Sequence, residues 1–133
     1  MARYFRPAGE MPDIYLYRPP IDFRKAAQGL AAIVAQELGH DPFAGALYAF
    51  TNRQRTKIKC LYWEDNGFVL YYKALAEEKF HWPQTGDGGV MALTAQQINW
   101  LLDGYDISLL KGHKKVVLRG AVLATYPDDF VII

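Results

Sequence analysis

The pattern of apolar and polar positions between residues 46 and 83 predicts a run of β-strands. Apolar and aromatic residues fill 46–51, a polar cationic segment occupies 52–56, and 57–63 reads as a second strand. Glu64-Asp65-Asn66-Gly67 follows as a strong turn signal, because Asn-Gly supplies the positive φ that tight hairpin turns need. Residues 68–75 and 80–82 are the third and fourth expected strands. The pattern therefore predicts two successive β-hairpins.

Side chains in these strands alternate between two faces. In the second strand Ile58, Cys60 and Tyr62 share one face. The other face carries Lys57, Lys59, Leu61 and Trp63. The third strand has apolar groups on both faces, so we expect it to be covered on both sides.

Two helices are expected outside the hairpins. After a short strand at 14–17, Asp22 is predicted to cap a helix that runs to Leu38 and ends at Gly39. Gly29 within this helix is expected to let a strand pack closely. The second helix opens with the capping box Thr94-x-x-Gln97 and stops at Gly104.

These elements predict an α+β fold in a single small domain. Its sheet is expected to be antiparallel and built of two hairpins, with one helix after the first strand and a second after the sheet. Residues 1–12 are predicted to form a flexible, basic N-terminal arm and 13–110 the domain. Residues 111–133 are predicted to be an extension with strands at 116–118 and 121–123.

Composition fits a folded domain and narrows the function. Of the 133 residues, 51% are hydrophobic and 14% aromatic, which argues against a disordered chain. The net charge of +1 means that any binding to nucleic acid must come from a local patch. The single cysteine, Cys60, allows neither an internal disulfide nor a zinc site built of thiolates. With no secretory signal or long apolar run in view, a cytoplasmic location is expected.

The cationic turn is the main candidate for binding. Arg53, Arg55, Lys57 and Lys59 occupy every second position, a period that places them on one face of a hairpin. One hypothesis is that they contact phosphates while Trp63 stacks on an exposed base. The other is that they form a solvated edge that discourages aggregation between sheets.

The sequence gives no catalytic constellation. The carboxylates Glu64, Asp65, Asp87, Asp103 and Asp106 have no spacing that demands a metal site. Cys60 is expected to be an inert core residue and not a nucleophile paired with His81. We therefore expect no catalytic residues, no metal and no cofactor. A helix-turn-helix is excluded because the whole sheet separates the two helices.

Several short motifs occur together in a specific order between residues 14 and 107. They include the residues Asp22, Arg24, Lys25, Gly29, Asp41, Pro42, Tyr71, Tyr72, Lys73, Trp82 and Pro83. In this order and spacing the chain resembles the TnpB accessory family, the second-open-reading-frame proteins of the IS66 class of bacterial insertion sequences. The RNA-guided nuclease that shares the name TnpB is a different protein.

The resemblance implies a non-catalytic helper for transposition, expected to act with a separate transposase of the same element and to bind it, DNA, or both. It supplies no catalytic residues to carry over. Two alternatives stay open: a protein-interaction module without contact to nucleic acid, and a small metal-dependent nuclease. Two features depart from the family, Ala26-Ala27 and the tail from Lys111 onward.

Overall fold

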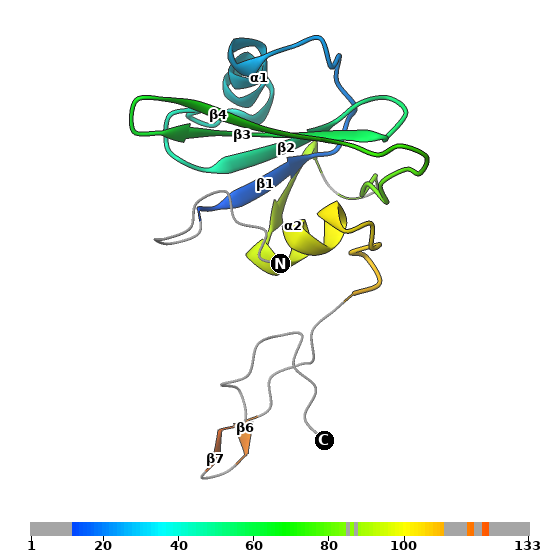
Figure 1. Cartoon of the computed structure of the whole chain (residues 1–133). Coiled ribbons are helices and arrows are strands. Elements are labelled where there is room, and N and C mark those ends of the chain that lie inside the picture. Colours follow the sequence, from blue (N-terminus) through cyan, green and yellow to red (C-terminus); the bar gives the residue numbers. More distant parts are fainter. Residues whose placement is uncertain (1–11, 85, 87, 111–116, 119–120, 123–133) are drawn as a thin grey trace.

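A five-stranded sheet lies between two helical layers in the computed structural model, which describes residues 12–84, 86, 88–110, 117–118 and 121–122. The strand order is β4-β3-β2-β1-β5. A helical segment covers one face and a shorter helix the other (Figure 1). The strands are β1 (Ile14–Tyr17), β2 (Leu47–Thr51), β3 (Lys57–Glu64), β4 (Gly67–Ala74) and β5 (Val90–Leu93). The helices are α1 (Ala27–Ile33), its π-helical continuation η1 (Val34–Leu38), and α2 (Ala95–Leu102).

The topology confirms the α+β class and the two successive hairpins β2–β3 and β3–β4. The expectation that every strand is antiparallel is wrong at one place. β1 and β2 pair in parallel, with Ile14 opposite Leu47. The cause is the connection, because the helical segment between these strands carries the chain back over the sheet before β2 begins.

The region between β4 and α2 differs from the prediction. The expected strand at 80–82 is absent, although Phe80 and Trp82 are both buried in the core. The fifth strand is instead β5, which pairs antiparallel with β1 from Ile14↔Leu93 to Tyr17↔Val90. β5 follows a glycine-rich loop and has only four residues, too few to show a period in the sequence.

The two sheet faces build two hydrophobic layers. Ile58, Cys60 and Tyr62 of β3 point toward α2, whereas Leu61 packs with α1, which confirms the predicted faces of this strand. β4 is an edge strand, so its predicted burial on both sides is wrong: Leu70 remains 36% exposed and Tyr72 49%.

The first helix begins later than predicted. Its N-cap is Ala26, without a side-chain cap, and Asp22 instead accepts a hydrogen bond from the backbone N–H of Arg24. The predicted end is confirmed, because Gly39 adopts a left-handed φ of 71°. A Cβ on Gly29 would meet the side chain of Lys25 at 3.1 Å, so the glycine accommodates that lysine and not a strand.

The β3–β4 turn lies where it was predicted but uses a different residue for its positive φ. Asp65, at φ 53°, is the left-handed residue of the turn. Glu64 and Gly67 pair as the last residues of the two strands. The Asn-Gly pair therefore marks the position of this turn but does not supply its left-handed conformation.

The N-terminal half of α2 forms as predicted. The Thr94 hydroxyl accepts from the backbone N–H of Gln97 at 3.0 Å, and the Gln97 side chain accepts from the Thr94 N–H at 2.9 Å. Gly104, at φ 96°, follows the last turn as expected.

The predicted ends of the chain are described only in part. The arm at 1–11 and the last residues, 123–133, lie outside the described residues. Within the extension, β6 (Val117–Leu118) and β7 (Ala121–Val122) pair antiparallel, in agreement with the expected strands over those four residues.

The capping box generates a prediction about stability. Thr94→Ala removes the hydroxyl that accepts from the Gln97 N–H but keeps the backbone N–H that donates to the Gln97 side chain, so we expect the free energy of unfolding to fall by about 1 kcal/mol. Urea denaturation measures the loss, and Thr94→Ser, which keeps the hydroxyl, is the control. An unchanged midpoint for Thr94→Ala would show that the cap does not stabilise α2.

Candidate nucleic-acid interface

The β2–β3 turn is organised by the side chain of Asn52, which is only 8% exposed. Its amide oxygen accepts from the backbone N–H groups of Thr56 at 2.9 Å and Lys57 at 3.1 Å. Its amide nitrogen donates to the Thr56 hydroxyl at 3.0 Å. This role of Asn52 was not predicted, although an asparagine at the start of a turn is a known signal for it.

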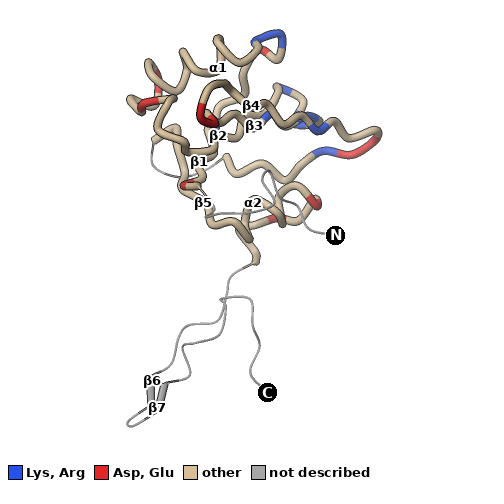
Figure 2. Tube along the Cα trace, turned by 60° about the vertical axis from the view of Figure 1, so that its left-hand side comes forward, with Lys and Arg blue, Asp and Glu red and all other residues tan. Residues whose placement is uncertain are grey.

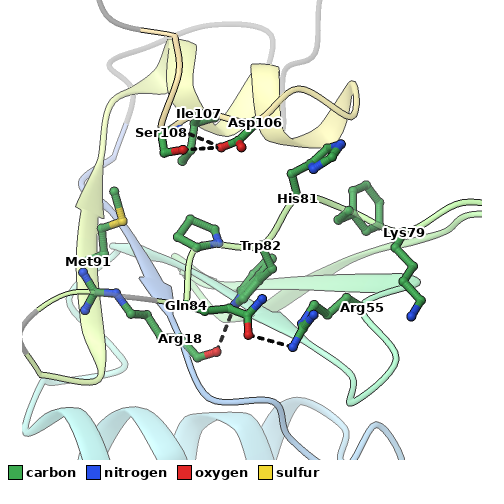
Figure 3. Close-up of a pocket in the computed structure, with 12 residues that line it drawn as sticks. Arg18, Arg55, Lys79, His81, Trp82, Gln84, Met91, Asp106, Ile107 and Ser108 are labelled. Atoms are coloured by element: carbon green, nitrogen blue, oxygen red, sulfur yellow. Dashed lines mark hydrogen bonds between the residues drawn. The ribbon is translucent and has the colours of Figure 1, made fainter.

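Arg55 leaves the turn in a different direction from its cationic neighbours. It has a φ of 60°, its guanidinium donates to the Gln84 side chain at 2.7 Å, and its carbonyl accepts from the Phe80 N–H at 2.8 Å. Arg55 therefore lines the pocket drawn in Figure 3, whereas Arg53 and Lys57 line a different cavity.

That second cavity, of about 710 Å³, lies between the β2–β3 turn and the loop before α1. We call it the cationic groove and define it by Arg24, Arg53 and Lys57, which line it. The Ile21 N–H donates to the Thr51 carbonyl at 2.9 Å and brings the two segments together. Figure 2 shows these two basic segments, one before α1 and one at the turn. Arg24 is a functional candidate that the sequence analysis did not place beside the turn.

Electrostatics in the groove favour an anion. Asp22 is the carboxylate among the lining residues, and it pairs with the Arg24 guanidinium at 2.6 Å. This hydrogen-bonded guanidinium lowers the pKa of Asp22. Arg53 and Lys57 form no ion pair within the described part of the chain. Two cations of the groove are therefore left for an external partner.

Lys59 does not belong to this surface, so the expectation of four cations on one exposed face is wrong. It is 7% exposed, and its ammonium donates to the carbonyls of Phe23 at 2.7 Å and Lys25 at 2.8 Å. The ammonium also lies 4.8 Å from the ring centre of Phe23 and 5.7 Å from that of Tyr72. Strand periodicity correctly predicts the face of the sheet on which the Lys59 side chain lies. The loop before α1 covers that face at this position.

Trp63 also lies away from the groove. Its ring packs edge-to-face against Phe43 and Phe68, each at 5.0 Å between ring centres. It lies six positions beyond Lys57 in β3, a distance of about 20 Å along a strand. The structure therefore does not bring Trp63 together with the turn cations.

The pocket around Arg55 has a volume of about 520 Å³ and a mixed character (Figure 3). Arg18, Lys79 and His81 line it together with Asp106. Arg18 donates to the carbonyl of Gly88 at 2.9 Å, and hydrogen bonds from Ser108 lower the pKa of Asp106. Arg18 is held by backbone carbonyls and Arg55 by Gln84, and the Asp106 carboxylate lines the same pocket, which makes it a weaker anion site than the groove.

The structure does not bring the candidate catalytic residues together in the part of the chain that it describes. Among the residues that the structure describes, no three His, Cys, Asp or Glu side chains gather to hold a metal ion; Asp87 lies outside them. Cys60 is fully buried in the core, and burial raises the pKa of its thiol, while His81 is exposed in the pocket beside Asp106.

Comparison with known proteins decides the family. The family model for IS66 Orf2-like proteins matches residues 12–112. The chain belongs to the IS66 Orf2-like protein family. Two relatives from Sinorhizobium fredii bear the names "Uncharacterized protein y4jC" and "Uncharacterized protein y4hO". The first is 32% identical over 105 residues, which cover 79% of this chain and 87% of the relative. The second is 29% identical over 100 residues, which cover 75% and 86%.

No solved structure matches this family member. In the described part of the chain, no helix has the length and apolar character needed to cross a membrane. The family match ends at residue 112, so the tail noted as a departure from the family falls almost entirely beyond it.

Three of the residues that carried the family resemblance, Lys73, Trp82 and Asp41, bind backbone groups of other segments or of their own loop. Lys73 donates to the last-turn carbonyl of Leu102 at 2.7 Å, and the Trp82 indole donates to the Arg18 carbonyl at 3.1 Å. Asp41 accepts from the Phe43 N–H at 2.9 Å. Of the others, Tyr71 packs against the α2-side core, Tyr72 contacts Phe23, Pro42 is half-buried and Pro83 lines the Arg55 pocket.

The different settings of Lys59 and Lys57 predict different effects of the same substitution. Lys59→Gln removes a charge that holds two backbone carbonyls, so we expect a loss of unfolding free energy on the order of 2 kcal/mol. Lys57→Gln changes a partly exposed side chain and should stay within about 0.5 kcal/mol of the unmodified protein. Urea denaturation compares the two, and equal losses would contradict the assigned role of Lys59.

Proposed function

We propose that this family member is a non-catalytic accessory protein for the transposition of an insertion sequence. It works in the bacterial cytoplasm with the transposase of the same element and contacts DNA phosphates through the cationic groove. The observation that carries the proposal is the convergence of Arg24, Arg53 and Lys57 from two separate segments on one open cavity.

The chemistry of the groove suits a phosphate backbone. Guanidinium groups donate in pairs to phosphate oxygens, and an ammonium adds a compact point charge. The groove offers Arg53 as a guanidinium without an ion-pair partner and Lys57 as the ammonium, whereas the guanidinium of Arg24 pairs with the carboxylate of Asp22. Phosphate contacts orient a protein on DNA but carry no base sequence, so the proposed binding is weak and largely nonspecific.

Rigid support of the groove favours binding. Asn52 fixes the turn through its hydrogen bonds to Thr56 and Lys57, and Lys59 fixes the opposite loop through the carbonyls of Phe23 and Lys25. A surface that is already ordered loses less conformational entropy when its ligand arrives. The residues beneath the groove therefore contribute to affinity without touching DNA.

A purely protein-binding module is the second candidate, and one observation favours it. Phe43 is 56% exposed and packs on Trp63 and Phe68 at the far end of the sheet, where aromatic side chains suit a protein partner. Under that alternative the groove cations are dispensable. The metal-dependent nuclease has no comparable observation in its favour among the described residues.

Salt dependence of DNA binding separates the candidates. With two phosphates neutralised, by Arg53 and Lys57, the slope of log affinity against log salt should be about −2 on duplex DNA. Arg53→Gln combined with Lys57→Gln should reduce the magnitude of that slope by about 2, because each lost phosphate contact removes about 0.9. Fluorescence anisotropy with a labelled duplex measures both quantities.

Matched single variants provide the control. Lys57→Gln and Lys79→Gln remove the same charge from two partly or fully exposed lysines, but only Lys57 lines the groove. We expect the first to flatten the slope and the second to leave it unchanged. Equal effects, or no binding at low salt, would overturn the groove and leave the protein-binding module as the better account.

A further inference from the structure

The outer edge of β4 is an open strand edge. β4 has eight residues and pairs with β3 along its whole length. It is the terminal strand of the five-stranded sheet, and no described strand pairs with its other side. Open edges present unpaired N–H and C=O groups that can accept another strand.

The register identifies which backbone groups point outward. The Leu75 N–H donates to the Thr56 carbonyl at 2.8 Å, which marks this pair as hydrogen-bonded. Hydrogen-bonded pairs alternate with non-bonded pairs along an antiparallel ladder. The inward-facing residues of β4 are therefore Val69, Tyr71 and Lys73. The outward-facing backbone groups belong to Phe68, Leu70, Tyr72 and Ala74.

This edge lacks the usual features that prevent pairing. It contains no proline, its register with β3 has no bulge, and Lys73 is its only charged residue. The Lys73 ammonium is held by the Leu102 carbonyl on the α2 side and does not shield the edge. Leu70 and Tyr72 are two of the large apolar side chains that remain exposed.

We propose that a second copy of this chain pairs with the edge, β4 against β4 in antiparallel orientation, to form a ten-stranded sheet. A two-fold axis at Leu70 places this residue opposite Leu70 of the partner subunit. Phe68 then lies opposite Tyr72 of the partner subunit, and the reverse pair follows by symmetry. Aromatic pairs across neighbouring strands stabilise a sheet.

Charge complementarity favours a second copy in this orientation. Asp65 lies exposed in the turn just before β4, and Lys73, whose ammonium donates to the neutral Leu102 carbonyl and so keeps its charge, lies near the end of β4. Antiparallel pairing brings the acidic end of each strand to the basic end of the other. A parallel arrangement would place like charges together and would not close as a two-fold dimer.

Sedimentation velocity of the full chain over a concentration series tests the proposal. We expect a reversible dimer that Leu70→Lys converts to a monomer with an unchanged circular dichroism spectrum. The Leu70 side chain is 36% exposed, so lysine fits at this position. Leu109→Lys, at a site that is 78% exposed and outside β4, is the control and should remain dimeric.

The register has its own test. Under mild oxidation Leu70→Cys should form a disulfide-linked dimer across the two-fold axis, whereas Ala74→Cys, which lies opposite position 66 of the other copy, should not. Cys60 is fully buried and does not compete. A protein that sediments as a monomer at every concentration, or a dimer that persists in Leu70→Lys, would overturn the proposal.

Discussion

The ammonium group of Lys59 holds the loop before α1 against the middle of the sheet, and several other features depend on this contact. A buried charge is costly unless its hydrogen bonds are satisfied. Here two backbone carbonyls accept from it, and the rings of Phe23 and Tyr72 lie within 6 Å, a range in which aromatic faces attract a cation. α1 begins without a side-chain cap, so Lys59, together with the hydrogen bond from the Ile21 N–H to the Thr51 carbonyl, fixes the segment in front of it. That segment carries Arg24, one wall of the cationic groove.

Side chains bind backbone groups of loops and element ends at three other places in the fold. Lys73 binds the end of α2, Trp82 binds the end of β1, and Asn52 binds the two residues after its own turn. In each case a long or polar side chain satisfies backbone groups outside the regular ladders, as buried backbone groups require. These side chains thereby attach the loops to the sheet, including the two loops that line the groove.

Local signals were sufficient for part of this structure. The β2–β3–β4 meander, the capping box at Thr94 and the helix end at Gly39 depend on neighbours in sequence, and all three were predicted correctly. The parallel pairing of β1 with β2 and the strand β5 depend on distant partners, and both were missed. Phe80 and Trp82 were predicted to lie in a strand because they are apolar. Both are buried in the core, but residues 80–82 form no strand.

Some features of the candidate site were likewise predictable from the sequence and others were not. Arg53 and Lys57 were recognised from charge alone, but only the chain's return from β1 brings Arg24 beside them. Lys59 was assigned to the exposed surface because strand alternation predicts which face of the sheet a side chain lies on. It does not predict that the loop before α1 covers that face at Lys59. Arg55 was grouped with its neighbours because no pattern in the sequence indicates its left-handed φ.

Amide-resolved NMR during titration with a short DNA duplex at low salt tests the central claim most directly. The account predicts that chemical-shift changes concentrate at residues 20–25 and 52–57, on the two walls of the cationic groove, and fade as salt is added. Changes confined to residues 79–84 and 106–108, around the Arg55 pocket, would contradict it, as would a spectrum that DNA leaves unchanged.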